Sequence, residues 1–497
     1  MIEPALGRLL NHALHTGLTA AEDVAYARNR VLEVLRIEDY DLVAESRDDP
    51  GGPLVGTPGN IDDLLRPLLE DAVVRGVITP DTVTQRDLWD SAVMGCFVQR
   101  PSAIARHFWD TYAVEPAAAT GWYHQQAVAS NYIRASRTDQ NVSWRQPTAY
   151  GEMDLTINVS KPEKDPRDII AAAREQAVGY PQCLLCRENE GYAGRADHPA
   201  RQNLRLIPMD LLRERWYLQY SPYRYYNEHC IVLSDEHRPM RIDRHTFERL
   251  AAFTGMFPHY LIGSNADLPI VGGSILSHDH FQGGRFEFAM DRARRLWTEE
   301  RGDLEISILH WPLAVIRLSG PDDAVIGMAT DILVAWREHS DPDFNIQAFT
   351  DEVPHNTITP IARRTEGRLR LDLVLRNNRT TPAHPDGLFH PHAQIHPIKK
   401  ENIGLIEVMG LAVLPGRLEH EFEAVAHALS EGGDLSGDLA GHGPMLEELR
   451  SEGGPDADPL TLTRHAAGAY FVRGLEHCGV FGDDPVTGIG RFLEMLH

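Results

Sequence analysis

The chain is predicted to be an α+β protein in which two similar halves follow a mainly helical N-terminal region. Residues 1 to about 130 have helical periodicity, and alternating, strand-like patterns begin near residue 140. Two segments of the form H-x-H-x-Q lie about 110 residues apart. That spacing exceeds a solenoid repeat, so it favours two related halves, with coincidence in a chain of 24 histidines as the alternative.

The helical N-terminal region is expected to span residues 1–135. Residues 20–32 show helical periodicity. Thr79-Pro80-Asp81 and Arg100-Pro101-Ser102 predict loop-to-helix starts, because proline is tolerated in the first helical turn. Residues 49–53, with two prolines and two glycines, predict a loop.

The first half is expected at residues 136–290. Met153 to Ser160 alternates apolar and polar residues, which predicts a half-buried antiparallel strand that ends at the segment 161–166. The further elements expected here are a helix from Arg167, strands at 216–220 and 229–233, a helix at 246–262 and a strand at 269–276.

The second half is expected at residues 291–430, and a Gly-rich loop with a helical tail at 431–497. The loop is expected from Glu431 to Gly443. The elements expected in the second half are strands at 315–318, 368–375 and 388–396 and helices at 322–339 and 421–429.

Composition limits the classes of function. A hydrophobic content of 42% and a charged content of 24% are typical of a soluble globular protein, and 497 residues suffice for two to four domains. No run of about 18 apolar residues and no secretion signal is seen. The five cysteines are few for a chain of this length and odd in number, which does not suit a disulfide framework. We therefore expect a cytoplasmic protein. The net charge of −24 argues against nucleic-acid or membrane partners. A phosphate-bearing substrate would therefore need a locally positive pocket.

The segment from Asp267 to Gly284, DLPIVGGSILSHDHFQGG, is the most informative part of the chain. Side chains alternate along a strand, so His278, His280 and Gln282 are expected on one face. A neutral imidazole whose other ring nitrogen bonds a backbone carbonyl is a good nucleophile toward phosphorus. The alternative for any single histidine is a packed or surface position. The glycines expected to let backbone N–H groups approach an anion are Gly272, Gly273, Gly283 and Gly284.

Cys183 and Cys186 form a C-x-x-C pair that can bind one Zn²⁺. His237, which follows a predicted strand, and His278 are the natural candidates for the other two ligands. Such a site is closed, hence structural, and it would leave His280 available for chemistry. The alternatives are a redox pair, which should lie in a βαβ pattern that is not seen, or two ordinary buried cysteines.

With these motifs the chain resembles the class II galactose-1-phosphate uridylyltransferases of the histidine-triad superfamily. The resemblance covers nearly the whole chain. Besides the segment 267–284, it includes the blocks Ser130–Arg134, Ile157–Pro166, Tyr180–Cys183, His355–Pro360 and His396–Gly404.

The resemblance implies two histidine-triad-like halves and a ping-pong exchange in which UDP-glucose and galactose 1-phosphate give glucose 1-phosphate and UDP-galactose. It implies that His280 becomes uridylylated and that Gln282 holds the phosphoryl oxygens. It also implies the zinc set proposed from spacing and a homodimer. The residues expected to contact substrate are Gly272, Gly273, Ser274, Gly283, Arg134, Arg137 and Lys161.

The sequence departs from the class I form of the family in two ways. Asp279 replaces the proline between the two histidines, so the geometry expected for this site is carried over from the class I enzymes. A second metal site is left open, with His355, His392 and His396 as candidate ligands. In addition, the string from His390 to Gln394 resembles the class I motif H-P-H-x-Q, so His392 is the alternative nucleophile.

Two other classes of function stay open at this point. The first is another histidine-triad enzyme that cleaves a dinucleotide by phosphorolysis or hydrolysis. The second is a non-enzymatic zinc protein in which the cysteines and histidines only build a fold or a partner surface.

Overall fold

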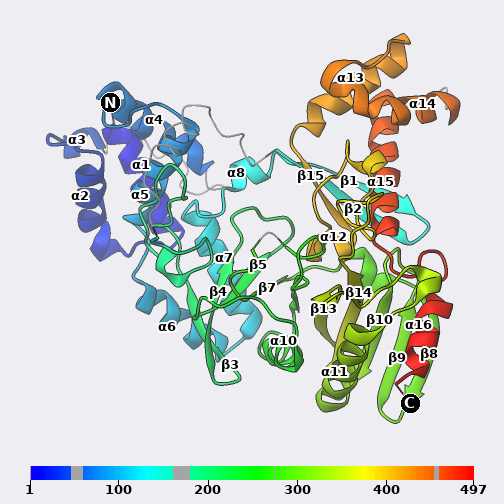
Figure 1. Ribbon diagram of the computed structural model, residues 1–497. Coiled ribbons are helices and arrows are strands. Elements are labelled where there is room, and N and C mark those ends of the chain that lie inside the picture. The colour runs from blue at the N-terminus through cyan, green and yellow to red at the C-terminus, as the bar shows by residue number, and fades with distance from the viewer. Residues whose placement is uncertain (1, 46–59, 160–178, 274, 453–457, 497) are drawn as a thin grey trace. The chain divides into compact units, whose positions relative to one another are not determined.

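The computed structural model describes residues 2–45, 60–159, 179–273, 275–452 and 458–496, which fall into two compact units (Figure 1). Unit 1 comprises Met1–Gln140, Ser160–Arg224 and Glu228–His237, and unit 2 comprises Asn141–Val159, Tyr225–Asn227 and Arg238–His497. None of the helices in these ranges has both the length and the apolar character needed to cross a membrane. The division at residues 135, 290 and 430 stays a prediction.

Unit 1 begins with helices and ends with a small antiparallel sheet. The predicted helix starts are confirmed: α5 begins after Thr82, whose hydroxyl accepts from the Gln85 N–H, and α6 begins at Pro101. The elements of unit 1 are α1 (Glu3–His15), η1 (Ala21–Asp23), α2 (Val24–Val34), α3 (Leu42–Glu45), α4 (Ile61–Val74), α5 (Val83–Gly95), α6 (Pro101–Tyr112), α7 (Pro116–Ala129), α8 (Ala135–Thr138), η2 (Arg187–Asn189), β3 (Ile207–Leu211), β4 (Glu214–Tyr220) and β5 (Cys230–Ser234).

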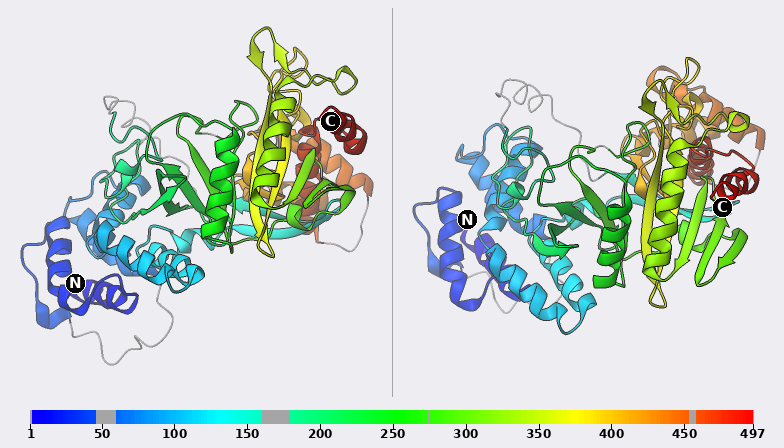
Figure 2. Two further views of the ribbon diagram at one scale, coloured as in Figure 1. Left: turned by 90° about the horizontal axis from the view of Figure 1, so that it is seen from below. Right: turned by 60° about the horizontal axis from the view of Figure 1, so that its bottom comes forward.

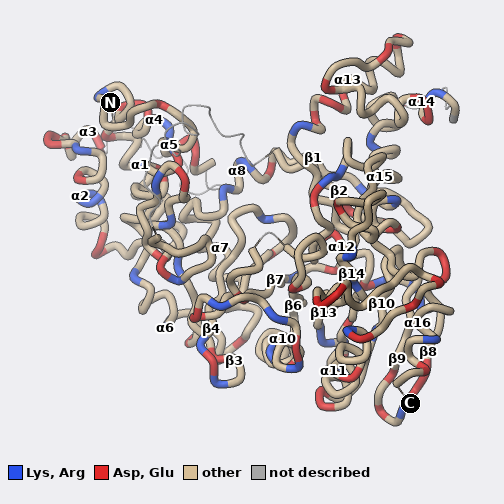
Figure 3. Tube along the Cα trace, viewed as in Figure 1, with Lys and Arg blue, Asp and Glu red and all other residues tan. Residues whose placement is uncertain are grey.

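The core of the helical region is built from apolar positions at helical spacing. Leu6, Leu9 and Leu10 of α1 are 0 to 3% exposed and pack in one cluster with Leu65 and Leu68 of α4. Burying each such side chain contributes about 1.5–3 kcal/mol. Charged residues of both signs are interspersed along the helices outside this core (Figure 3), and several form local ion pairs.

Unit 2 holds two sheets, a two-stranded ribbon and the helices that cover them. The predicted strands near 153, 315 and 368 and the predicted helices near 322 and 421 are confirmed. The elements of unit 2 are β1 (Val142–Thr148), β2 (Gly151–Asn158), α10 (Arg244–Met256), β6 (Leu261–Gly263), β7 (His280–Gly284), η3 (Ala289–Arg292), β8 (Arg295–Arg301), β9 (Leu304–Leu309), β10 (Val315–Gly320), α11 (Asp322–Glu338), η4 (Pro342–Phe344), β11 (Phe349–Thr350), β12 (Val353–Pro354), β13 (Asn356–Thr365), β14 (Arg368–Asn377), η5 (Ala393–Ile395), α12 (Leu405–Val408), β15 (Leu411–Pro415), α13 (Leu418–Glu431), η6 (Gly437–His442), α14 (Gly443–Glu452), α15 (Pro459–His477) and α16 (Pro485–Glu494).

The larger sheet of unit 2 is antiparallel, in the order β7-β6-β13-β14-β10-β9-β8. The β13–β14 hairpin turns at Glu366 and Gly367, which both have positive φ, as a two-residue hairpin turn requires. Helix α11 lies along β13, β14 and β10 (Figure 2) and buries Val325, Ala329 and Trp336. The second sheet joins β1 and β2 antiparallel and β2 and β15 in parallel. The α+β fold class is thus confirmed.

Three predicted elements are wrong in type or length. The described residues of the segment expected as a strand at 269–276 (269–273 and 275–276) do not form one: Ile270 has φ +74° and Gly272 makes only an isolated bridge to Ala266. Residues 388–396 form turns and η5, because Pro391 has no N–H to donate to a neighbouring strand. The helix expected at 246–262 ends at Met256, before a proline, and its last residues become β6. The loop at 49–53 and the helix from Arg167 lie outside the described residues.

Candidate active site

His280 is the first residue of β7 and is 6% exposed. Its Nδ1 lies 2.8 Å from the carbonyl oxygen of His278. A carbonyl can only accept, so Nδ1 carries the proton and Nε2 keeps its lone pair. Burial lowers the pKa of His280 to about 4, which keeps the imidazole neutral near pH 7. The hydrogen bond expected for a histidine nucleophile is therefore present.

The neighbours of His280 divide between two faces. Phe281 is 1% exposed, whereas Gln282, opposite Gly263 of β6, is half-buried and shares the face of His280. His278 is fully buried and precedes the strand, in a bend. The opposite-face residue Asp279 lies 3.2 Å from Nε of Arg238. His280 and Gln282 thus share one face of a strand, as expected, whereas His278 lies in the loop that leads into the strand.

The incoming loop, residues 265–273, is closely packed. A Cβ on Gly272 would lie 2.5 Å from the carbonyl oxygen of Ala266, and a Cβ on Gly273 would lie 2.6 Å from Nδ2 of Asn265. Real Cβ atoms do not approach so closely. Both positions therefore require glycine for packing, whether or not a ligand approaches their backbone.

Two hydrogen-bonded relays hold this loop in unit 2. His355 donates from Nδ1 to Oδ1 of Asn378 (2.8 Å), and Nδ2 of Asn378 donates to the carbonyl of Pro269 (3.3 Å). His390 lies 3.3 Å from Oδ1 of Asn402, and Nδ2 of Asn402 donates to the carbonyl of Gly272 at 3.4 Å. In each relay a histidine orients an amide, and the amide fixes a loop carbonyl.

The N-terminal end of β13 holds the incoming loop at a third point. Thr357 donates its hydroxyl to Asp267, and the other carboxylate oxygen of Asp267 accepts from the Ile242 N–H at 2.9 Å. Sequence reasoning missed Asn378 and Asn402. The signal for Asn378 is its place directly after β14, next to another buried asparagine.

Cys183, Cys186 and His237 of unit 1 form a group of metal-ligating side chains. Their ligand atoms all lie within 4.8 Å of one another. The two Sγ atoms are 3.5 Å apart, and Sγ of Cys186 is 3.2 Å from Nδ1 of His237. The loop that carries the cysteines is fixed by Asn189, whose Nδ2 donates to the carbonyls of both.

These distances fit a tetrahedral zinc ion. Zn–S bonds of about 2.3 Å and Zn–N bonds of about 2.0–2.1 Å put two sulfurs about 3.8 Å apart, and a sulfur and a nitrogen about 3.6 Å apart. Burial, reinforced by Cys183, raises the pKa of Cys186 to about 12, so a thiolate there needs a cation beside it. None of the five cysteines, all of which the structure describes, forms a disulfide. The group is of a kind that could hold a metal ion.

Two of the predicted phosphate-binding arginines make ion pairs in unit 1. Nη1 of Arg134 lies 2.8 Å from Oδ2 of Asp90, and Nη2 of Arg137 lies 2.6 Å from Oδ1 of Asp87. These pairs give both arginines a structural role, and their contact with substrate stays a prediction. Lys161 and Ser274 lie outside the described residues.

The alternative nucleophile His392 has a different environment from His280. Its Nε2 lies 3.1 Å from the carbonyl of Leu388, and its ring stacks on His477 with centroids 4.1 Å apart. The other proposed ligands of a second metal are also engaged: His355 as described, and His396 with the carbonyl of Pro391 at 3.0 Å. A second metal therefore stays a prediction.

Comparison with known proteins gives full-length relatives. The family model for the N-terminal domain of galactose-1-phosphate uridyl transferase matches residues 18–239, and that for the C-terminal domain matches residues 254–439. The galactose-1-phosphate uridylyltransferase of Clostridium acetobutylicum is 44% identical, and the alignment covers 100% of both chains. That of Bacillus subtilis is 46% identical over 99% of this chain and 97% of its own.

A solved structure of yeast Ap4A phosphorylase is similar to 60% of this chain and 89% of its own, at 13% identity and a TM-score of 0.31. A score this low carries no argument about fold or function.

Proposed function

Since the chain belongs to the galactose-1-phosphate uridylyltransferase family, we propose that it exchanges UMP between UDP-glucose and galactose 1-phosphate through a uridylyl group on His280. The enzyme is a nucleotidyltransferase, and full-length relatives favour this activity over a dinucleotide phosphorylase or hydrolase. The observation that supports His280 most directly is its hydrogen bond from Nδ1 to the carbonyl of His278, which puts the proton on Nδ1 and leaves the lone pair on Nε2.

In the first half-reaction, Nε2 of His280 attacks the α-phosphorus of UDP-glucose. A P–N bond forms as the bond from that phosphorus to the bridging oxygen breaks, and its electron pair leaves with glucose 1-phosphate. Nδ1 keeps its proton, so the ring becomes cationic, and the carbonyl of His278 stabilises that charge. Gln282, on the same face, is proposed to hold the phosphoryl oxygens.

In the second half-reaction, a phosphate oxygen of galactose 1-phosphate attacks the same phosphorus. The P–N bond breaks, its electrons return to Nε2, and UDP-galactose leaves. No net proton transfer at Nδ1 is required in either direction, which suits two half-reactions that share one site. The relays to Pro269 and Gly272 would keep the loop before His280 in place through both.

We also propose that the metal group is a structural zinc site of Cys183, Cys186, His237 and His278, each of which offers one ligand atom. A bound zinc ion would supply a cross-link and would stabilise both thiolates. Full burial of His278 supports its assignment as a ligand over a surface role. The reaction steps above do not pass through this metal.

The remaining proposals follow the family and the chain's composition. Gly272, Gly273 and Gly283 are proposed to lie near substrate, together with the arginines and Lys161 named above. We propose that the protein is a homodimer and that it lies in the cytoplasm. The small, odd number of cysteines supports this compartment.

The test of the nucleophile is incubation with UDP-glucose labelled in the uridine. Wild-type enzyme and His392→Asn should become labelled, and galactose 1-phosphate should discharge the label. His280→Asn should take up none while its circular dichroism and zinc content stay at wild-type values. Labelling of His280→Asn but not of His392→Asn would reverse the assignment, and discharge by water or phosphate alone would indicate a hydrolase or phosphorylase.

The test of the metal site is zinc content by atomic absorption. Cys183→Ser should lower zinc content and thermal stability together, whereas Cys96→Ser, a half-buried cysteine outside the group, should keep both. Unchanged zinc in Cys183→Ser would remove that residue from the ligand set.

A further inference from the structure

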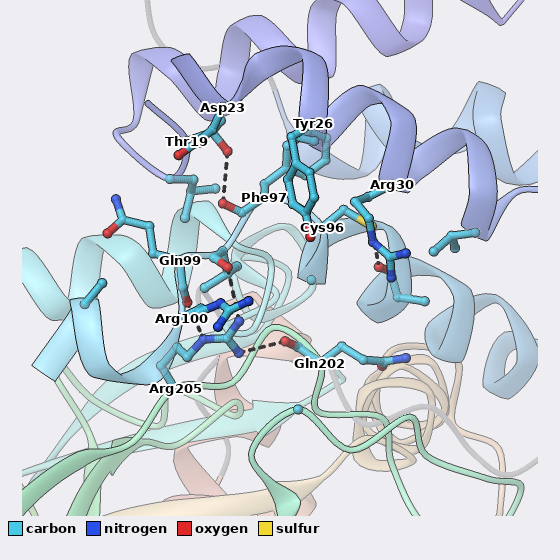
Figure 4. Close-up of a pocket in the computed structure, with 18 of the residues that line it drawn as sticks. Thr19, Asp23, Tyr26, Arg30, Cys96, Phe97, Gln99, Arg100, Gln202 and Arg205 are labelled. Atoms are coloured by element: carbon cyan, nitrogen blue, oxygen red, sulfur yellow. Dashed lines mark hydrogen bonds between the residues drawn. The ribbon is translucent and has the colours of Figure 1, made fainter. Parts of the chain in front are cut away.

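Unit 1 contains a cavity of about 730 Å³ that none of the predicted site residues lines. It lies between α2, the turn that joins α5 to α6, and the loop segment at Gln202 and Arg205 (Figure 4). Small-molecule sites usually measure about 300–1,000 Å³. The cavity is therefore large enough for an organic ligand, and not only for a single ion.

Four arginines line this cavity in a strongly acidic protein. Arg30 comes from α2, Arg100 from the N-cap of α6 and Arg205 from the loop (Figure 4). Arg106 lies in the middle of α6, and Asp23 is the single acidic residue of the lining. Arg30 pairs with Glu33. In the described part of the chain, no carboxylate forms an ion pair with any of the other three.

Arg205 is held rigidly by neutral groups and makes no ion pair within the described residues, although the charge of Glu190 acts on it. Its guanidinium donates to backbone carbonyls, at 2.6 Å to Gln99, 2.9 Å to Gln202, 2.7 Å to Leu204 and 3.1 Å to Val98. Burial lowers its pKa from the usual value, which reflects the cost of a charge enclosed mainly by neutral groups. An anion in the cavity would offset that cost.

Helix α6 adds to the positive field. It has 12 residues, and its N-cap, Arg100, provides no side-chain hydrogen bond to the first turn. The N-terminal end of a helix carries about half a positive charge. The cavity lining thus combines cationic side chains with a helix terminus of the same sign.

Charge balance indicates which anion fits. Among the lining residues, three arginines without ion-pair partners and Asp23 sum to two positive charges, and Glu190, which is outside the lining, offsets part of the charge of Arg205. A phosphate monoester carries about −1.5 to −2 near pH 7 and matches this charge better than a simple carboxylate does. Arg205 already donates to four backbone carbonyls, so the guanidinium forks that can pair with phosphate oxygens are those of Arg100 and Arg106.

The rest of the lining suits an organic group attached to the phosphate. Tyr26, at 66% exposure, offers a ring face, while Gln99 and Gln202 offer amides for hydroxyl or ring-nitrogen contacts. Cys96 takes no part in chemistry here, because burial raises its pKa to about 11. We propose that this cavity is a binding site for a small phosphorylated organic molecule, distinct in its residues from those assigned to uridylyl transfer.

The test is isothermal titration calorimetry of the whole protein with AMP, glucose 6-phosphate and inorganic phosphate. The double variant Arg100→Gln/Arg106→Gln removes two unpaired cations, and the control pair Arg8→Gln/Arg213→Gln removes two arginines outside the cavity. At least one organic phosphate should bind wild type and the control more tightly than inorganic phosphate does. It should bind the double variant roughly tenfold more weakly or worse.

The probe that binds most tightly indicates which kind of organic phosphate the cavity accepts. Preference for AMP, lost in Tyr26→Ala, would indicate a nucleotide, and preference for glucose 6-phosphate would indicate a sugar phosphate. Circular dichroism and labelling by UDP-glucose should be unchanged in the double variant, which separates lost binding from misfolding. Equal affinity of the double variant and the control, or no binding of either organic phosphate to wild type, would overturn the proposal.

Discussion

Replacing Gly283 by alanine should separate two strands that position His280. Gly283 lies opposite Ile262 in the β6–β7 pair, and its carbonyl accepts from the Tyr226 hydroxyl at 2.9 Å. A Cβ at Gly283 would lie 2.4 Å from the carbonyl oxygen of Leu261, whereas ordinary contacts begin near 3.4 Å. The strands must therefore move apart by about 1 Å, the difference between these two distances.

This displacement gives two magnitudes. Overpacking of this kind costs about 1–3 kcal/mol of stability. A shift of about 1 Å in a reacting group can slow a reaction by about 100-fold. Because Gly283 is three residues from His280 on the same strand, we expect Gly283→Ala to label with UDP-glucose about 100-fold more slowly than wild type.

The assay combines urea unfolding with the rate of label uptake in a single turnover. Gly327→Ala is the matched control, because Gly327 lies within α11 and a Cβ there meets nothing within 4 Å. That variant should label at the wild-type rate and gain up to about 1 kcal/mol of helix stability. If Gly283→Ala labels as fast as Gly327→Ala, the strand spacing does not control the nucleophile and the reasoning fails.

Three further predictions concern other parts of unit 2. Asp372→Asn should cost about 3–5 kcal/mol in urea unfolding, because Arg317, 4% exposed, loses the carboxylate that pairs with it at 2.6 Å, and Asp291 is left to balance Arg317, Arg363 and Arg370; a loss below about 1 kcal/mol would contradict this. His339 is buried, neither of its ring nitrogens has a hydrogen-bond partner among the described residues, and burial lowers its pKa below 6.5. Below pH 6.5 the unfolded state therefore binds more protons than the folded state, so the stability of the wild type should fall as the pH falls. The stability of His339→Leu should fall less. Urea unfolding midpoints at pH 7, 6 and 5 test this. Asn402→Ala removes one hydrogen bond to the carbonyl of Gly272, worth about 1 kcal/mol. Labelling should therefore slow about fivefold, with zinc content unchanged. An unaltered labelling rate would show that Asn402 does not help to position the loop.

Most of the secondary structure was predictable because local patterns agree with the fold. The helical spacing near Ala20 belongs to α2, which buries Ala27 and Val31 on one face. The alternation near Met153 correctly marks the strand β2, but residues 155–158 are all buried, so the strand is not half-buried as expected. The failures share a different cause. The described residues of 269–276 are mostly apolar and lie in a loop in which Val271 is buried, Ile275 and Leu276 are half-buried and Pro269 is exposed. A short apolar run does not distinguish such a loop from a strand. At 388–396 the histidines recur with a period of two, which predicts a strand, but Pro391 has no N–H to donate to a neighbouring strand.

The candidate site was predictable where the signal is local in sequence. The spacing of Cys183 and Cys186 constrains both thiols to one turn of chain, and His280 is two residues from the carbonyl that orients it. The relays through Asn378 and Asn402 join positions more than 100 residues apart, so no local pattern marks them. The carboxylates that pair with Arg134 and Arg137 lie 44 and 50 residues away in the sequence, and no local pattern marks them either.

The small sheet of unit 2 has a consequence for synthesis of the protein. Strand β15 pairs in parallel with β2, so Leu411 lies beside Asp154 although more than 250 residues separate them in the chain. During translation the β1–β2 hairpin is complete long before its third strand leaves the ribosome, and its open edge is a template for wrong pairing. Chains that stop before residue 411 keep that edge exposed. Termination after Gly284 but before residue 411 should therefore yield aggregation-prone products, even though the residues assigned to catalysis have all been made.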